Sequence, residues 1–149
     1  MTNTSKIFER LGKLLPGFSG YYNRESLRES DYQLRLHIKQ KIEELVHDIE
    51  RSKLSLDDDL LLKMDKVQNN LKLFSVKISN QSYGYSAMFD KVNSEDDMRE
   101  DKLNSLIEND EKLVDLVETL STDNNEIEDL EILEKELNKL LGQRKEILR

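Results

Sequence analysis

The sequence predicts an all-α fold: an antiparallel up-down helical bundle of four helices, or of three helices with a long continuous C-terminal helix. Only one proline and five glycines interrupt 149 residues, as long helices require. Apolar residues recur every three or four positions, which is the period of a helix with one buried face. Because 36% of the residues are charged and the mean hydropathy is −0.72, the other faces must be solvated.

The first two long helices are predicted over residues 26–53 and from about Ser55 onward. Ser55 is the expected N-cap of the second helix, with Asp57 and Asp58 near the exposed amides of its first turn. The second helix carries the most regular heptad of the chain, made of Leu60, Met64, Val67, Leu71, Phe74 and Ile78. The short connection between the two helices predicts that they are antiparallel neighbours.

A third helix is predicted from an N-cap at Ser94 to about Leu120, and a fourth extends to the C-terminus. Residues 121–125 are five weak helix formers in a row, Ser-Thr-Asp-Asn-Asn, but they include neither glycine nor proline. Two architectures therefore stay open. In one the chain turns at this segment, and in the other a single helix runs over residues 95–149 and projects as a coiled-coil arm.

Four ionisable residues fall on the apolar helix faces and form a predicted buried polar cluster: Asp31, Arg99, Asp110 and Arg144. A buried charge must be paired, because an isolated one is very costly. Position along the helices predicts that Asp31 meets Arg99 or Arg144, and Arg144 can join only if the fourth helix folds back. The same estimate puts Asp110 roughly 15 Å deeper, with a tyrosine hydroxyl or water as its partner.

The charge is divided unevenly, and this suggests two parts, residues 1–24 and residues 25–149. The first part has a net charge of +3 and the second −11, so binding of nucleic acid by the bundle is not expected. The first part begins with a predicted basic amphipathic helix, formed by Lys6, Ile7, Phe8, Arg10, Leu11, Lys13, Leu14 and Leu15. This helix either packs on the bundle or a partner, which we favour, or makes weak peripheral contact with an anionic membrane.

Two loops rich in glycine and aromatic residues follow the N-terminal helix and the second long helix. Their candidate interaction residues are Phe18, Gly20, Tyr21, Tyr83, Gly84, Tyr85 and Phe89. Since the second long helix returns to the end at which the first begins, we expect the loops to be near each other. They either close the end of the bundle, which we favour, or form a binding pocket.

These loops carry a resemblance to an uncharacterised bacterial family of helical proteins. The family is characterised by a Leu-Pro-Gly-aromatic-x-Gly-Tyr opening and a Tyr-Gly-Tyr-x-x-x-Phe-Asp loop. The matching residues begin with Leu15, Pro16, Gly17, Phe18, Gly20 and Tyr21, continue with Glu25, Arg28, Asp31 and Arg35, and end with Tyr83, Gly84, Tyr85, Phe89, Asp90 and Asp110. The charged run expected at the start of the first long helix is Asn23-Arg24-Glu25 here, so the match is imperfect. The resemblance implies no activity, but it suggests an association with membrane stress.

No pattern in the sequence indicates an enzyme. The absence of cysteine excludes disulfides, a thiolate nucleophile and a cysteine-based zinc site. Glu44 and His47 form a single Glu-x-x-His unit on the polar side of their helix, whereas di-iron bundles need two inward-facing units. His37 has no nucleophile in a catalytic arrangement, and no cofactor or metal is expected.

The sequence therefore predicts a helical interaction or adaptor module in a larger assembly, which binds a protein partner or self-associates. The alternative is a peripheral membrane stress-response factor anchored by its N-terminal helix, and a small-ligand sensor built on the aromatic loops ranks third. No apolar run reaches the roughly 20 residues that span a bilayer, and no signal peptide is recognisable. We expect a cytoplasmic location, with the inner face of the membrane as the alternative.

Overall fold

The computed structural model describes residues 3–15, 24–81, 96–119 and 126–148, and every regular element in these ranges is helical. The elements are α1 (Asn3–Leu14), α2 (Arg24–Ser52), the 3-10 helix η1 (Lys53–Ser55), α3 (Asp58–Ser79), α5 (Asp96–Thr119) and α6 (Ile127–Leu148). Side chains are described over 9–15, 29–81, 101–119 and 126–148. The predicted all-α fold class is confirmed.

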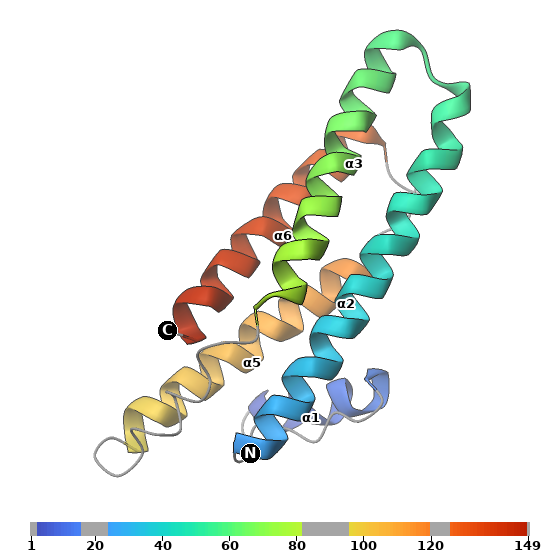
Figure 1. Ribbon diagram of the computed structural model, residues 1–149. Helices are drawn as coiled ribbons and strands as arrows, with labels where there is room; N and C mark the ends of the chain where they lie inside the picture. Colours follow the sequence, from blue (N-terminus) through green and yellow to red (C-terminus); the bar gives the residue numbers. More distant parts are fainter. Residues whose placement is uncertain (1–2, 16–23, 82–95, 120–125, 149) are drawn as a thin grey trace.

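The four long helices form a closed ring in which α2 and α3, and likewise α5 and α6, are antiparallel neighbours, whereas α3 and α6 run in the same direction, as do α2 and α5. Helix α2 packs on α3, α3 on α6, α6 on α5, and α5 on α2, while α1 lies against α5 (Figure 1). The alternative of one continuous helix over residues 95–149 is wrong, because α5 ends at Thr119 and α6 packs back along it. The side-chain amide Nδ2 of Asn109 on α5 donates a hydrogen bond to the Leu140 carbonyl on α6 at 2.9 Å, which ties the two helices together.

The predicted apolar faces meet in one buried core. On α2 the buried face comprises Leu34, Ile38, Ile42, Leu45 and Ile49, and on α3 it comprises Met64, Val67, Leu71, Phe74 and Ile78. Helix α5 contributes Leu106, Ile107, Leu113, Val114 and Val117, and α6 contributes Ile127, Leu130, Leu137, Leu140, Leu141 and Leu148. Burial of these faces is the main favourable contribution to folding.

The turn between α2 and α3 differs from the prediction in one detail, the identity of the N-cap. Ser55 closes η1, and its hydroxyl donates to the Ser52 carbonyl at 3.1 Å. The N-cap of α3 is Asp57, whose carboxylate accepts from the Leu60 amide at 2.9 Å. Both residue types are good caps, and the 3-10 turn decides between them because it occupies the Ser55 hydroxyl.

Candidate functional site

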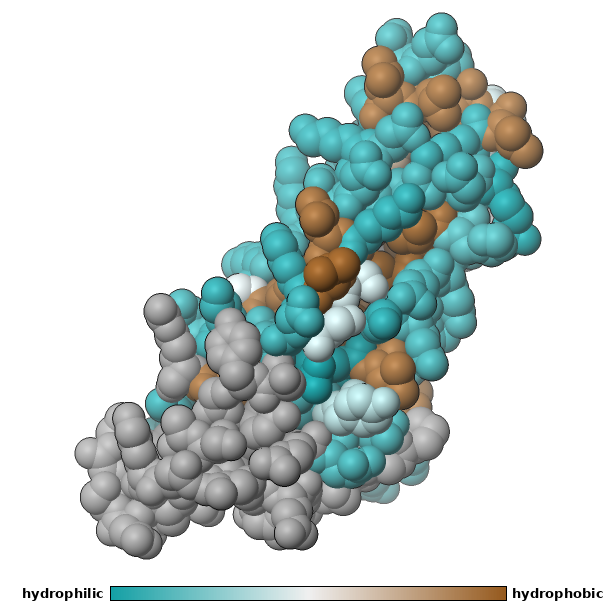
Figure 2. Space-filling view, viewed as in Figure 1, coloured by the Kyte–Doolittle hydropathy of each residue, from teal (hydrophilic) through white to brown (hydrophobic). Residues whose placement is uncertain are grey.

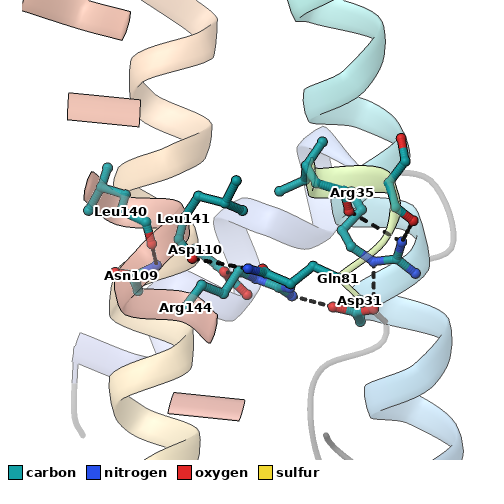
Figure 3. Close-up of polar contacts among 10 residues, drawn as sticks. Asp31, Arg35, Gln81, Asn109, Asp110, Leu140, Leu141 and Arg144 are labelled. Carbon is teal, nitrogen blue, oxygen red and sulfur yellow. Dashed lines mark hydrogen bonds and ion pairs between the residues drawn. The ribbon is translucent and has the colours of Figure 1, made fainter. Parts of the chain in front are cut away.

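The most extensive polar feature is a buried network centred on Arg144 of α6, whose side chain is fully buried. Its Nε donates to Asp110 Oδ1 on α5 at 2.7 Å, and its Nη1 donates to Gln81 Oε1, just beyond α3, at 3.1 Å. Its Nη2 donates to Asp31 Oδ1 on α2. One guanidinium thus connects three other segments of the bundle (Figure 3). Since both carboxylates are also fully buried, these charge-assisted hydrogen bonds are shielded from water.

The network extends through Asp31 to a second arginine on the same helix. Arg35 Nε donates to Asp31 Oδ2 at 2.8 Å, four residues away along α2. Its Nη1 donates to the Ser79 carbonyl at 2.8 Å, and Ser79 is the last residue of α3. Terminal carbonyls of a helix lack intrahelical donors, so Arg35 caps α3 while it pairs with Asp31.

The described part of the network contains two cations and two anions, so the formal charges of these four groups balance. Neutral amides complete it on the α6 side, because Gln81 Nε2 donates to the Leu141 carbonyl at 3.0 Å. The charged groups are directed at one another inside the core, and none of these four charged side chains is more than 10% exposed. Such an arrangement can fix the relative positions of helices, but it offers a substrate no direct access to a reactive group.

The structure brings together three of the four predicted cluster residues, Asp31, Asp110 and Arg144. The predicted pairing of Asp31 with Arg144 is present, and the side chain of Arg99 lies outside the described residues. The prediction that Asp110 lies far from this level is wrong. It assumed that the helices begin at the same height, whereas the N-terminal part of α5 extends beyond the end of α6 (Figure 1).

A smaller polar cluster joins α2 and α3 near the opposite end of the hairpin. The buried Gln68 donates from Nε2 to Glu50 Oε2 at 2.8 Å and to the Val46 carbonyl at 3.1 Å. The hydrogen bond from Gln68, and after it the bond from Lys53, holds the pKa of Glu50 below its usual range. Lys53 bonds to Asp65 and Glu50, and these contacts raise its pKa. The cluster ties the two helices directly beside the core, since Glu50 and Gln68 follow the buried residues Ile49 and Val67.

Helix α1 docks on the bundle through both apolar and charged contacts. Leu11 and Leu15 are buried in the common core, which is the packing alternative favoured for this helix. Arg10 bonds to Asp115 on α5 and lies 3.9 Å from Glu111, and the hydrogen bond to Asp115 raises the Arg10 pKa. Of the other predicted residues, Leu14 packs against the core, Lys13 is exposed, and the side chains of Lys6, Ile7 and Phe8 lie outside the described residues.

Neither histidine forms the kind of site that its neighbours in sequence suggest. Glu44 and His47 are both exposed on α2, as the helical spacing predicted. His37 Nε2 lies 2.6 Å from Glu118 Oε1, a contact between α2 and α5 that the sequence analysis missed. No spacing rule connects these two residues, because they are 81 positions apart.

The predicted loop residues Phe18, Gly20, Tyr21, Tyr83, Gly84, Tyr85 and Phe89 lie outside the described residues. The helices that flank the two loops are described. Because α2 and α3 are antiparallel neighbours, the first residue of α2 and the last of α3 lie at the same end of the bundle. The shared pocket stays a prediction.

The clearest candidate contact surface lies on the outer side of α3. Leu73 and Val76 are 57% and 58% exposed there, although the inner side of the same helix is fully packed. Val76 and Asn80 line two grooves, one between α2 and α3 of about 540 Å³ and one between α3 and α6 of about 420 Å³. The space-filling view, which faces α2 and α3, shows apolar patches interrupting the otherwise polar surface along these helices (Figure 2).

Comparison with protein-family models, with curated proteins and with solved structures gave no match. The resemblance to a bacterial helical family therefore stays a prediction. Among the described residues no helix has the length and apolar character needed to cross a bilayer.

Proposed function

We propose that this protein is a non-enzymatic interaction module whose outer α3 surface contacts a protein partner in a larger assembly. The observation that carries the proposal is the exposure of Leu73 and Val76 on a helix that already buries a full heptad face. Single exposed apolar residues are ordinary. These two residues lie one helical turn apart, and Val76 lies between two grooves. Together they form a continuous apolar surface bordered by grooves, which a partner can contact.

The buried network supports the same proposal. Its charged groups, on α2, α5 and α6, are directed at each other, which suits a rigid scaffold that holds an outer surface in place. The membrane alternative receives no such support, because Leu11 of α1 and Leu15, which directly follows that helix, are buried in the core. Those side chains would have to leave the core before they could enter a lipid layer.

Site-specific photocrosslinking in the native cells tests the proposal. A photoreactive phenylalanine analogue is placed at Val76, and in a separate variant at Ile132 of α6, which is 65% exposed. We expect a discrete crosslinked adduct of higher mass from position 76 and none from position 132. Equal labelling at the two positions, or no adduct at position 76, would refute a partner on the outer α3 surface.

A further inference from the structure

The outer α3 surface has a local charge opposite to that of the whole chain. Lys39 and Lys72 line the groove between α2 and α3, and Lys77 and Lys145 line the groove between α3 and α6. Among the described residues that line the two grooves, Glu43 is the one carboxylate, and it lies 3.8 Å from Lys39. The net charge of the chain is −8, so this concentration of cations around Val76 is a local feature.

Three of these lysines form no ion pair within the described part of the chain. Lys72, Lys77 and Lys145 are all exposed, and no carboxylate among the described residues lies within 4.0 Å of their ammonium groups. Their charges are therefore available to a ligand that approaches Leu73 and Val76. We name this set, Leu73 and Val76 with Lys72, Lys77 and Lys145, the α3 ridge.

We propose that the α3 ridge binds an acidic amphipathic helix of a partner protein. Apolar side chains of that helix would pack beside Leu73 and Val76, and its carboxylates would pair with the lysines along the two grooves. An amphipathic helix in a groove between helices is a recurring mode of peptide recognition. The inference deepens the proposed interaction function and depends on it.

Charge also distinguishes this ligand from an anionic membrane or a nucleic acid. The N-terminal turn of α3 carries the exposed carboxylates Asp57, Asp58 and Asp59. An extended anionic surface laid along α3 would meet them as well as the lysines. A short helix in the grooves senses mainly charges within a Debye length, about 8 Å at physiological salt. The ridge therefore fits a short acidic segment better than an extended polyanion.

Gly142 of α6 provides independent support for an open groove. Glycine inside a helix destabilises it by roughly 1 kcal/mol relative to alanine. A Cβ at position 142 would have no heavy atom within 4 Å, so packing within the described chain does not require the glycine. Because Gly142 lines the groove between α3 and α6, this open space is part of that groove.

Peptide titration of the full-length protein tests the inference. The probe is a synthetic 18-residue helix-forming peptide (about five turns) with leucines on one face and glutamates elsewhere. Its control has lysine at every glutamate position. We expect the glutamate peptide to shift the NMR amide signals of the α3 ridge and the lysine peptide to leave them unchanged. The variant K72E/K77E/K145E should weaken glutamate-peptide binding at least about tenfold, as three attractive pairs become repulsive.

The matched control K63E/K112E/K139E reverses three exposed lysines that line neither groove, and it should bind the peptide as the wild type does. Equal weakening by both variants, or binding of the lysine peptide, would overturn the inference. Binding of phosphatidylglycerol vesicles in place of the peptide would overturn it too. Crosslinking at Val76 separates the two proposals. If the adduct at Val76 persists in K72E/K77E/K145E, the acidic-helix ligand is refuted and the interaction function stands. If the wild type gives no adduct, the interaction function itself is refuted.

Discussion

Replacing Asp31 with leucine tests whether the buried network determines the stability of the bundle. The Asp31 carboxylate accepts from two guanidinium groups, those of Arg35 and Arg144. Hydrogen bonds to charged groups contribute about 1.5–3 kcal/mol each. Arg144 keeps its bonds to Asp110 and Gln81 in the variant, so the two contributions are not lost in full. We expect the free energy of unfolding to fall by about 3 kcal/mol, because Asp110 is then the one carboxylate left among these four groups to balance Arg35 and Arg144.

Urea unfolding followed by circular dichroism measures this loss, and the m-value should stay constant because the buried area hardly changes. The control is Asp48→Leu, which removes a surface contact with Arg51 on the same helix and should cost under about 0.5 kcal/mol. The variant D31L/D110L/R144L should lose less stability than Asp31→Leu, because packed apolar residues often replace buried ion pairs without loss. A cost below about 1 kcal/mol for Asp31→Leu, or additive effects of Asp31→Leu and Arg144→Leu, would refute a coupled network.

Three further predictions concern α6, the α2–α3 cluster and α1. Gly142→Ala should raise the free energy of unfolding by about 0.5–1 kcal/mol, since helix propensity improves and nothing lies within 4 Å of the new methyl group; an unchanged or lower Tm would contradict this. Gln68→Leu should move the lowered pKa of Glu50 back toward 4.5, because the Gln68 hydrogen bond is the main cause of the shift. The stability linked to Glu50 is present above its unfolded pKa and is lost as the pH falls through the lower folded pKa. NMR titration measures the shift, and an unmoved pKa contradicts its cause. Leu11→Ala should cost about 2–5 kcal/mol and Arg10→Ala under about 1 kcal/mol, measured by urea unfolding. Equal costs would mean that charge, not burial, docks α1.

Periodicity was sufficient to predict the all-α class and the four long helices, but it left open whether the chain turns at residues 121–125. An apolar seam such as Val67, Leu71, Phe74 and Ile78 is buried only against a continuous partner surface. Each of the four longest segments contains such a seam. The same reasoning placed Asp31 and Arg144 inside the core, because their positions around the helix follow from 100° per residue. Angular position depends on the sequence of one helix alone, so it is predictable without knowledge of the neighbouring helices.

Height along the bundle is a different quantity, since it depends on where each helix begins relative to its neighbours. Asp110 was misplaced for this reason, because α5 extends past α6 by an amount that no local pattern encodes. Gln81 was missed because it lies beyond the last turn of α3, where helical spacing no longer applies. Arg35 had a signal that was not used, since Asp31 and Arg35 are four residues apart, the spacing of helical ion pairs.

The buried network and the α3 ridge meet at two consecutive residues of α6. Arg144 is directed inward by its bonds to Asp31 and Asp110. Lys145 follows it 100° further around the helix, and it lines the groove that it shares with Lys77. A rotation or slip of α6 that removed Arg144 from its carboxylates would also move Lys145 away from Lys77. The ion pairs inside the core would therefore set the spacing of the cations outside it, and under the proposed acidic-helix binding this is how the buried network would contribute to recognition.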